Sequence, residues 1–168
     1  MLHLWLKISN IRNPMDEKKI NVLYIDDEPN NITSFQAAFR RIYTVFTAES
    51  AEEGRKIVDT ENIHVILSDQ RMPKTTGIEF FQSILATHPD PIRILITGYT
   101  DINAVIDAIN LGQVYKYLTK PWNEEEVKNY INKAYEVFDL RQQNRELTQK
   151  LIEANEKLEF LARQNLLS

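Results

Sequence analysis

The sequence predicts an α/β fold: a doubly wound, five-stranded parallel sheet with helices on both faces. Five short apolar, β-branched segments alternate with segments whose apolar residues recur at helical spacing. This alternation is typical of a parallel sheet, because parallel strands need a crossover connection, which a helix provides. The 168 residues suffice for one such domain and an appendage, and 43% of them are hydrophobic, enough for a core.

The expected strands are short runs of branched aliphatic and aromatic residues, each shorter than a typical buried helix. The first, residues 21–25 (NVLYI), ends just before two aspartates, and the fourth, residues 92–97 (IRILIT), ends on a threonine. The other three are residues 43–48 (YTVFTA), 64–68 (HVILS) and 115–118 (YKYL).

One helix is expected after each strand. The ranges are residues 31–42, 50–61, 77–88 and 101–111, with a last helix starting near Asn123. In the first, one face collects Ile32, Phe35, Ala38, Phe39 and Ile42. Ser50 is an expected N-cap, with Glu53 as its capping-box partner. Gly112 suits the left-handed position that ends many helices.

Composition excludes several functional classes. The chain has no cysteine, so disulfides, thiolate chemistry and cysteine-ligated metals are impossible. Its formal net charge of -4 offers no general attraction to nucleic acid or to an anionic membrane. No apolar run approaches the ~20 residues of a membrane helix. Residues 1–18 lack periodicity and a signal-peptide cleavage pattern, so we expect a poorly ordered leader on a cytoplasmic protein.

Polar side chains from four segments should meet at one edge of the sheet. They are Asp26 and Asp27 after the first strand, Asp69 after the third, Thr97 at the end of the fourth and Lys120 after the fifth. The carboxyl ends of parallel strands lie along one rim, where α/β folds bind their ligands. We therefore expect these groups to form one site.

Three carboxylates gathered at one place repel one another unless a cation relieves them. Mg²⁺ fits, because it prefers carboxylate and water oxygens. With Lys120 and the Thr97 hydroxyl, this site would hold a phosphoryl group, and Asp69 would act as nucleophile to form an acyl phosphate. Taken alone, each residue has a simpler interpretation: Asp26 or Asp27 as a helix cap, Lys120 as a solvated lysine.

These motifs resemble the receiver domain of two-component response regulators. They are IDDE (25–28), SDQRMP (68–73), ITG (96–98) and YLTKPW (117–122). Each is weak alone, but the set occurs in the family's order and spacing and is highly specific. The resemblance implies the flavodoxin-like strand order 2-1-3-4-5 over a receiver domain at residues 19–138.

The resemblance also implies roles for the acidic residues. Asp69 would be the phosphoacceptor. Asp27, Asp69 and the backbone carbonyl of Arg71 would ligate Mg²⁺, and Asp26 would assist through water. No organic cofactor is implied.

Further roles follow from the same resemblance. Lys120 would bond the phosphoryl group, Thr97 and Tyr117 would form the switch pair, and the Lys120–Pro121 bond is typically cis. The protein would be a signalling switch rather than an enzyme, receiving its phosphoryl group from a histidine kinase or a phosphotransfer protein. Alternatively, it is the receiver fragment of a longer regulator whose effector lies beyond Ser168.

Two other functional classes fit the residues poorly. Haloacid-dehalogenase enzymes also form an aspartyl phosphate, but they need a second aspartate where Gln70 and Arg71 follow Asp69. A flavin- or dinucleotide-binding module needs a glycine-rich phosphate loop after the first strand, and this chain has DDEPNN there, whose acids repel phosphate.

The last helix should continue past the receiver domain as an extension, residues 139–168, since no proline or glycine follows Pro121. Heptads with Val137 at position a place Val137, Asn144, Leu151, Leu158 and Asn165 at a, and Leu140, Leu147, Ala154, Leu161 and Ser168 at d. This pattern predicts a coiled-coil homodimer, with Asn144 setting register. The alternative is a helix that folds back on its own domain. Mixed charges and the lack of a second helix argue against DNA binding.

Overall fold

Five parallel strands form one sheet in the order β2-β1-β3-β4-β5. They are β1 (Asn21–Ile25), β2 (Thr44–Ala48), β3 (Val65–Asp69), β4 (Ile92–Thr97) and β5 (Lys116–Thr119). This computed structural model describes residues 19–168, so the expected leader lies outside the described residues. The strand order confirms the predicted doubly wound, flavodoxin-like sheet.

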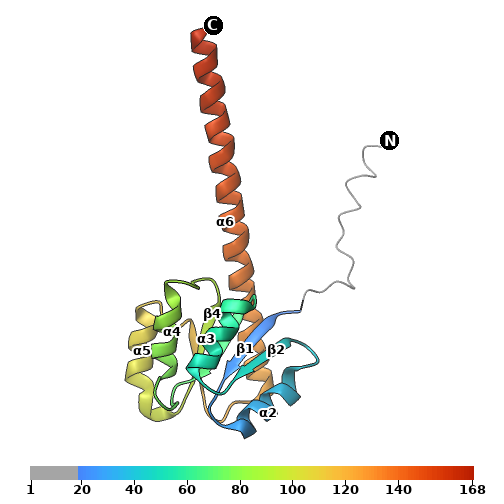
Figure 1. The fold of residues 1–168 in the computed structure, drawn as a ribbon, viewed down its shortest axis with the longest axis vertical. Coiled ribbons are helices and arrows are strands. Elements are labelled where there is room, and N and C mark those ends of the chain that lie inside the picture. Colours follow the sequence, from blue (N-terminus) through green and yellow to red (C-terminus); the bar gives the residue numbers. More distant parts are fainter. Residues whose placement is uncertain (1–18) are drawn as a thin grey trace, which may run out of the picture.

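Helices cover both faces of the sheet (Figure 1). They are α2 (Pro29–Phe39), α3 (Ala51–Thr60), α4 (Gly77–Leu85), the 3₁₀ turn η1 (Tyr99–Asp101), α5 (Ile102–Asn110) and α6 (Glu124–Leu167). Strand residues alternate between two cores, as the two-residue period requires. Val22 and Tyr24 pack with α2 and the start of α6, whereas Leu23 and Ile25 pack with α3, α4 and α5.

Two helices differ from the sequence prediction by more than one residue. α2 begins at Pro29, because the fixed φ of proline suits the first helical turn, and it ends at Phe39. Ile42, predicted on the buried face, is therefore outside the helix and 42% exposed. α4 ends at Leu85 rather than at His88, whose amide still donates to the carbonyl of Ile84 as a terminal turn.

Helix capping follows the sequence in part. Ser50 accepts from the amide of Glu53, but the Glu53 carboxylate accepts from the amide of Glu49, so the predicted reciprocal box is incomplete. A complete capping box occurs at the start of α4, between Thr76 and Glu79. Gly112 has φ +72°, which confirms its left-handed role at the end of α5.

A buried arginine ties loops together at the edge of the sheet opposite the acidic residues. Arg93 on β4 is 7% exposed and donates to the carbonyls of Gln113 (2.8 Å), Pro91 (2.9 Å), Pro89 (3.3 Å) and Gly112 (3.3 Å). Burial lowers the pKa of Arg93 below its usual range, yet a guanidinium stays charged in proteins. These bonds hold the loops before β4 and β5 against the sheet.

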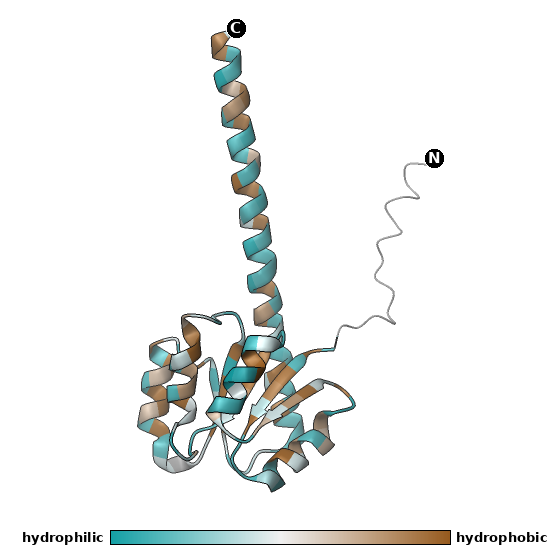
Figure 2. Cartoon of the chain, in the orientation of Figure 1, coloured by the Kyte–Doolittle hydropathy of each residue, from teal (hydrophilic) through white to brown (hydrophobic). Residues whose placement is uncertain are grey.

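The long helix α6 has two parts. Its first turns are buried through Val127, Ile131 and Ala134. Beyond them it projects from the body of the fold (Figure 1) and carries apolar residues along its exposed length (Figure 2). Across residues 19–168, no helix has the length and apolar character needed to cross a membrane.

Candidate functional site

Three aspartates meet where β1 and β3 end. Ile25 on β1 pairs with Ser68 on β3. Asp26 comes directly after Ile25 and Asp69 directly after Ser68, so the two aspartates occupy adjacent positions on neighbouring strands. One carboxylate oxygen from each of Asp26, Asp27 and Asp69 lies within 4.8 Å of the others. Asp26 is fully buried and Asp69 is 6% exposed. The structure thus brings the three predicted carboxylates into one cluster.

Asp26 is held by neighbours that the sequence analysis missed. Its Oδ2 accepts from the Tyr24 hydroxyl (2.8 Å) and from the Asn31 amide (3.0 Å), and its Oδ1 accepts from the Glu28 backbone (2.9 Å). Burial and Asp26 raise the pKa of Tyr24 well above its usual range, so the tyrosine remains a donor. Strand alternation could have revealed Tyr24, since residues two apart share a face.

Lys120 supplies the positive charge of the cluster. Its Nζ lies 3.1 Å from Asp69 Oδ1 and 3.8 Å from Asp26 Oδ2. Its backbone amide donates to the carbonyl of Thr97 (3.0 Å), which anchors the loop after β5 to the end of β4. The Lys120–Pro121 peptide bond is cis, as the family resemblance implies.

Electrostatics at Asp69 are a balance of opposing effects. Burial raises its pKa, Lys120 lowers it through a hydrogen bond and its charge, and Asp26 and Asp27 raise it further. The net direction is upward, so ionised Asp69 is held in an unfavourable environment when no cation is bound.

We predict that Asp69→Asn stabilises the metal-free protein at neutral pH. A raised pKa means that Asp69 contributes stability below the pKa of the unfolded chain, and that this stability is lost as pH rises through the folded-state pKa. Thermal unfolding in chelator should show a higher Tm for Asp69→Asn than for wild type, with the difference shrinking as pH falls. A lower Tm for the variant at neutral pH would contradict this balance.

The two proposed switch residues lie on neighbouring strands. Thr97 ends β4 and is fully buried, and its hydroxyl donates to the carbonyl of Gly98 (3.1 Å). Tyr117 lies on β5, paired with Leu95, and packs half-buried against the core on the α3–α5 side. In this state the Thr97 proton is therefore directed at Gly98, and a bond to a group on Asp69 requires the hydroxyl to turn.

Arg71 extends across the mouth of the site. Its Nε donates to Asp101 Oδ2 (3.1 Å) and its Nη2 donates to the hydroxyl of Thr100 (2.8 Å). The side chain therefore links the loop after β3 to the turn after β4. Its backbone carbonyl, the atom predicted as a metal ligand, is not engaged by this link.

The loop after Asp69 is fastened to the start of α4 by residues that the sequence analysis did not single out. Gln70 accepts from the Ile78 amide through its side chain (3.1 Å) and from the Gly77 amide through its backbone (3.1 Å). A Cβ on Gly77 would lie 2.5 Å from the carbonyl oxygen of Asp69 and 2.7 Å from the side chain of Leu95. Glycine at position 77 thus allows α4 to begin in direct contact with the site.

We predict that Gly77→Ala destabilises the fold by about 1–3 kcal/mol, as overpacking does elsewhere. Helix propensity alone predicts the opposite sign, because alanine is the better helix former. Chemical denaturation should show the loss. Gly98→Ala is the matched control, since a Cβ there meets nothing within 4 Å. Equal stabilities for the two variants would mean that α4 is free to move away from Asp69.

The donor set suits a hard divalent cation. Its ligands are carboxylate oxygens, the type that Mg²⁺ prefers. Asp26 already accepts three hydrogen bonds, so most of the remaining acceptor capacity belongs to Asp27 and Asp69. Asp27 is not buried, which leaves that side of the cluster open to water.

A family model for the response regulator receiver domain matches residues 22–132. The chain belongs to this family, and its function is that of a receiver domain in two-component signalling. This confirms the resemblance found in the sequence motifs.

The curated relatives that match this chain include transcriptional regulatory proteins. The hydrogenase transcriptional regulatory protein HoxA of Cupriavidus necator is 34% identical over 127 residues, which are 76% of this chain and 26% of that protein. The transcriptional regulatory protein GlrR of Escherichia coli is 29% identical over 123 residues, 73% of this chain and 28% of that protein. The matched region therefore spans about a quarter of the length of these relatives.

Two solved structures have a fold similar to that of this chain. A receiver domain protein from Clostridium thermocellum has a TM-score of 0.68 at 28% identity, covering 72% of this chain and 98% of that one. A crystal structure described as adenylate cyclase from Rhodopirellula baltica has a TM-score of 0.76 at 28% identity, covering 79% of this chain and 98% of that one.

Proposed function

We propose that Asp69 accepts a phosphoryl group and that the resulting acyl phosphate switches the conformation of the domain. The supporting observation is the contact between Lys120 Nζ and Asp69 Oδ1 at 3.1 Å inside a cluster of three carboxylates. An oxygen of Asp69 would attack the phosphorus of the donor, and the donor's leaving group would depart with the electrons of its bond. Lys120 would then pair with an oxygen of the transferred group.

We assign the metal site to Asp27 and Asp69, with the Arg71 carbonyl as a third ligand and Asp26 acting through water. Mg²⁺ bound there would neutralise charge on the phosphoryl oxygens during transfer. Asp26 would act by position: three donors orient its carboxylate, which in turn holds Lys120 near Asp69.

Uptake from a small phosphodonor tests this function. Incubation with acetyl phosphate and Mg²⁺ should add one phosphoryl group to the intact protein, as measured by mass, and chelation of the metal should prevent it. Asp27→Asn should raise the Mg²⁺ concentration that uptake requires, whereas Asp107→Asn, which changes an exposed acid on α5, should behave as wild type. Equal phosphoryl uptake in the presence of chelator would show that uptake does not require a metal ion.

Thr97 and Tyr117 would carry the conformational signal. An acyl phosphate supplies acceptor oxygens that the resting site lacks, so the Thr97 hydroxyl can leave the Gly98 carbonyl and donate to the phosphoryl group. Tyr117 would then move into the space that Thr97 vacates. Because this Thr97–phosphoryl contact exists only in the switched conformation, it shifts the equilibrium from the resting to the switched conformation.

We predict that Thr97→Ala accepts phosphate but fails to switch. Uptake measured by mass should be retained, because the nucleophile, metal ligands and Lys120 are unchanged. Amide spectra of α5 should move on phosphorylation in wild type and stay near the resting positions in the variant. Coinciding spectra of the two phosphorylated proteins would mean that the signal bypasses Thr97.

The output would pass through the extension, residues 139–168, as a parallel coiled-coil homodimer. Its seam leucines are 55–71% exposed in the single chain: Leu140, Leu147, Leu151, Leu158 and Leu161. Parallel pairing also places Asn144 opposite Asn144 of the second chain, where the two side-chain amides can hydrogen-bond each other. A second chain along this seam would cover the leucines.

The phosphodonor would be a histidine kinase or a phosphotransfer protein. Since the matched region makes up only about a quarter of these relatives, we propose that the signal passes to an effector, either joined beyond Ser168 or bound by the extension. A pull-down with the extension as bait tests the second case.

A further inference from the structure

We propose that Asp90 and Arg145 are positioning residues: their ion pair clamps the extension to the receiver body and sets the direction in which the coiled-coil seam leaves it. The part of this inference that concerns signalling rests on the proposed function. The part that concerns the resting protein does not.

The clamp joins segments 55 positions apart in the chain. Arg145 Nη2 donates to Asp90 Oδ1 (2.8 Å) and Nη1 donates to Oδ2 (3.2 Å), a two-pronged geometry that fixes direction as well as distance. Hydrogen bonding from Arg145 holds the pKa of Asp90 below its usual range, so the carboxylate is ionised at neutral pH. Gln142, one turn earlier on α6, also hydrogen-bonds this carboxylate.

The receiver end of the clamp is rigidly mounted. Asp90 lies between Pro89 and Pro91, and the carbonyls of both prolines accept hydrogen bonds from the buried Arg93. The carboxylate is thereby tied to β4 through its two neighbours. Any movement of α6 relative to Asp90 is then movement relative to the sheet.

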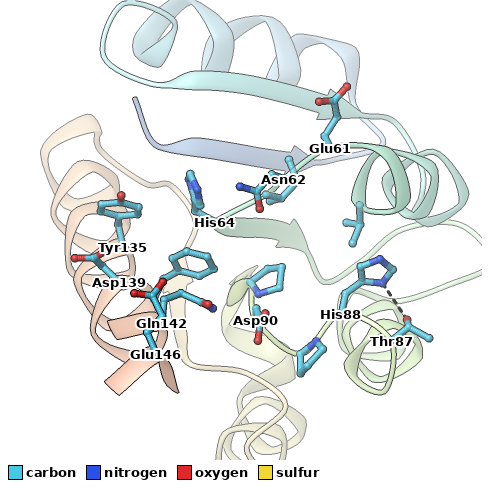
Figure 3. A pocket seen from close by; sticks show the side chains of 15 residues that line it. Glu61, Asn62, His64, Thr87, His88, Asp90, Tyr135, Asp139, Gln142 and Glu146 are labelled. Carbon is cyan, nitrogen blue, oxygen red and sulfur yellow. Dashed lines mark hydrogen bonds between the residues drawn. The ribbon is translucent and has the colours of Figure 1, made fainter. Parts of the chain in front are cut away.

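Next to the clamp, α6 contacts the body through the ring of His64, which meets the rings of Tyr135 (5.2 Å between centroids) and Phe138 (4.9 Å). An open pocket of about 430 Å³ lies between the helix and the body beside these contacts. Figure 3 shows Tyr135, Asp139 and Gln142 on the α6 side, with Asn62 and His88 among the residues of the body. Close-packed interfaces resist displacement, whereas a void leaves room for it. Past Phe138, Gln142 and Arg145 join α6 to the body through Asp90, so the direction of the helix beyond Phe138 depends on the clamp.

A short rigid element joins the clamp to the acceptor site. α4 begins in contact with the Asp69 carbonyl at Gly77, and after it ends at Leu85 the chain reaches Asp90 within five residues. Because Arg93 ties Asp90 to β4, a displacement at the acceptor end of α4 would affect the clamp by shifting the loop after Leu85 against that tie. In the predicted heptads Arg145 occupies a b position, outside the a/d seam, so the clamp and the dimer can exist together.

Distance measurements between spin labels test the clamp. The chain has no cysteine, so Lys56→Cys on α3 and Gln149→Cys on the extension can be labelled specifically. Labelled protein is diluted with unlabelled protein so that each dimer carries one pair. The resting wild type should give a narrow distance distribution. Asp90→Ala and Arg145→Ala should each broaden it to a similar degree, and the double variant should be no broader than either single variant.

Two controls keep the result specific. The charge-exchanged protein, Asp90→Arg with Arg145→Asp, should recover much of the narrow distribution. Arg163→Ala, which removes an exposed arginine paired within the helix to Glu159, should leave it unchanged. An unchanged distribution in both Asp90→Ala and Arg145→Ala would overturn the clamp.

The effect of phosphorylation on the clamp is measured with the same spin-labelled proteins. Acetyl phosphate with Mg²⁺ should shift the wild-type distribution and leave that of Arg145→Ala broad, at equal phosphate uptake by mass. Uptake without a shift in wild type would overturn coupling through α4. Absence of uptake would instead count against the proposed phosphoacceptor and leave the resting-state clamp standing.

Discussion

Asp69→Asn is expected to abolish phosphoryl uptake from acetyl phosphate. The amide that replaces the carboxylate is not a nucleophile toward phosphorus, and Asp26 is occupied by three hydrogen bonds and fully buried. Intact mass after incubation with Mg²⁺ should show no added phosphoryl group in the variant. The change in side-chain size is minimal, so folding should be preserved.

Asp107→Asn controls for the loss of one acidic charge, because Asp107 is an exposed acid on α5 and does not belong to the cluster of Asp26, Asp27 and Asp69. It should take up phosphate as wild type does. Full phosphoryl uptake in Asp69→Asn would show that another residue is the phosphoacceptor and would contradict the assignment of Asp69.

Leu151→Asn is expected to dissociate the proposed dimer. Leu151 is 71% exposed in the single chain and occupies an a position near the middle of the seam. Burial of one leucine contributes about 1.5–3 kcal/mol, and a dimer layer contains two. The dissociation constant should therefore rise at least roughly a hundredfold. Sedimentation equilibrium of the full chain measures it.

The neighbouring residue provides a matched control. Ile152 is also exposed, at 47%, but lies at a b position on the outer side of the predicted helix pair. Ile152→Asn should leave the dissociation constant close to that of wild type. Equal effects of the two substitutions, or a monomeric wild type at micromolar concentration, would reject the seam.

Local sequence patterns predicted the sheet well. The run IRILIT at residues 92–97 coincides with β4, because a β-branched segment bounded by polar residues has few other stable arrangements. The register of the strands could not be read from the sequence, since it depends on pairing between distant segments. Helix ends were harder: Pro29 begins α2, whereas the periodicity of apolar residues pointed to a later start.

The acidic cluster was predictable for a topological reason. Parallel strands end at the same rim, so Asp26, Asp69 and Lys120 had to approach one another once the sheet was known. Supporting residues were not predictable in the same way. Gly77 matters because of a backbone contact with Asp69, and Gln70 because of a bond to the start of α4. Both contacts arise from tertiary packing that leaves no local signature.

The clamp was also beyond sequence reasoning. Arg145 reads as one of many charges on an exposed helix, and Asp90 as a turn residue between prolines. Only the course of α6 past the edge of the sheet brings the two together. Arg93 was overlooked for a related reason, since an arginine within an apolar strand signals either an exposed edge or, as here, a buried group with many carbonyl partners.

Location of the acyl phosphate in the wild-type chain tests the central claim most directly. Protein incubated with acetyl phosphate and Mg²⁺ is treated with borohydride, which reduces an aspartyl phosphate to homoserine, and the digest is sequenced by mass spectrometry. The account predicts homoserine at position 69 alone, and none when the metal is chelated. Homoserine at position 26 or 27, or an unmodified digest from protein that has been shown to be folded, would contradict it.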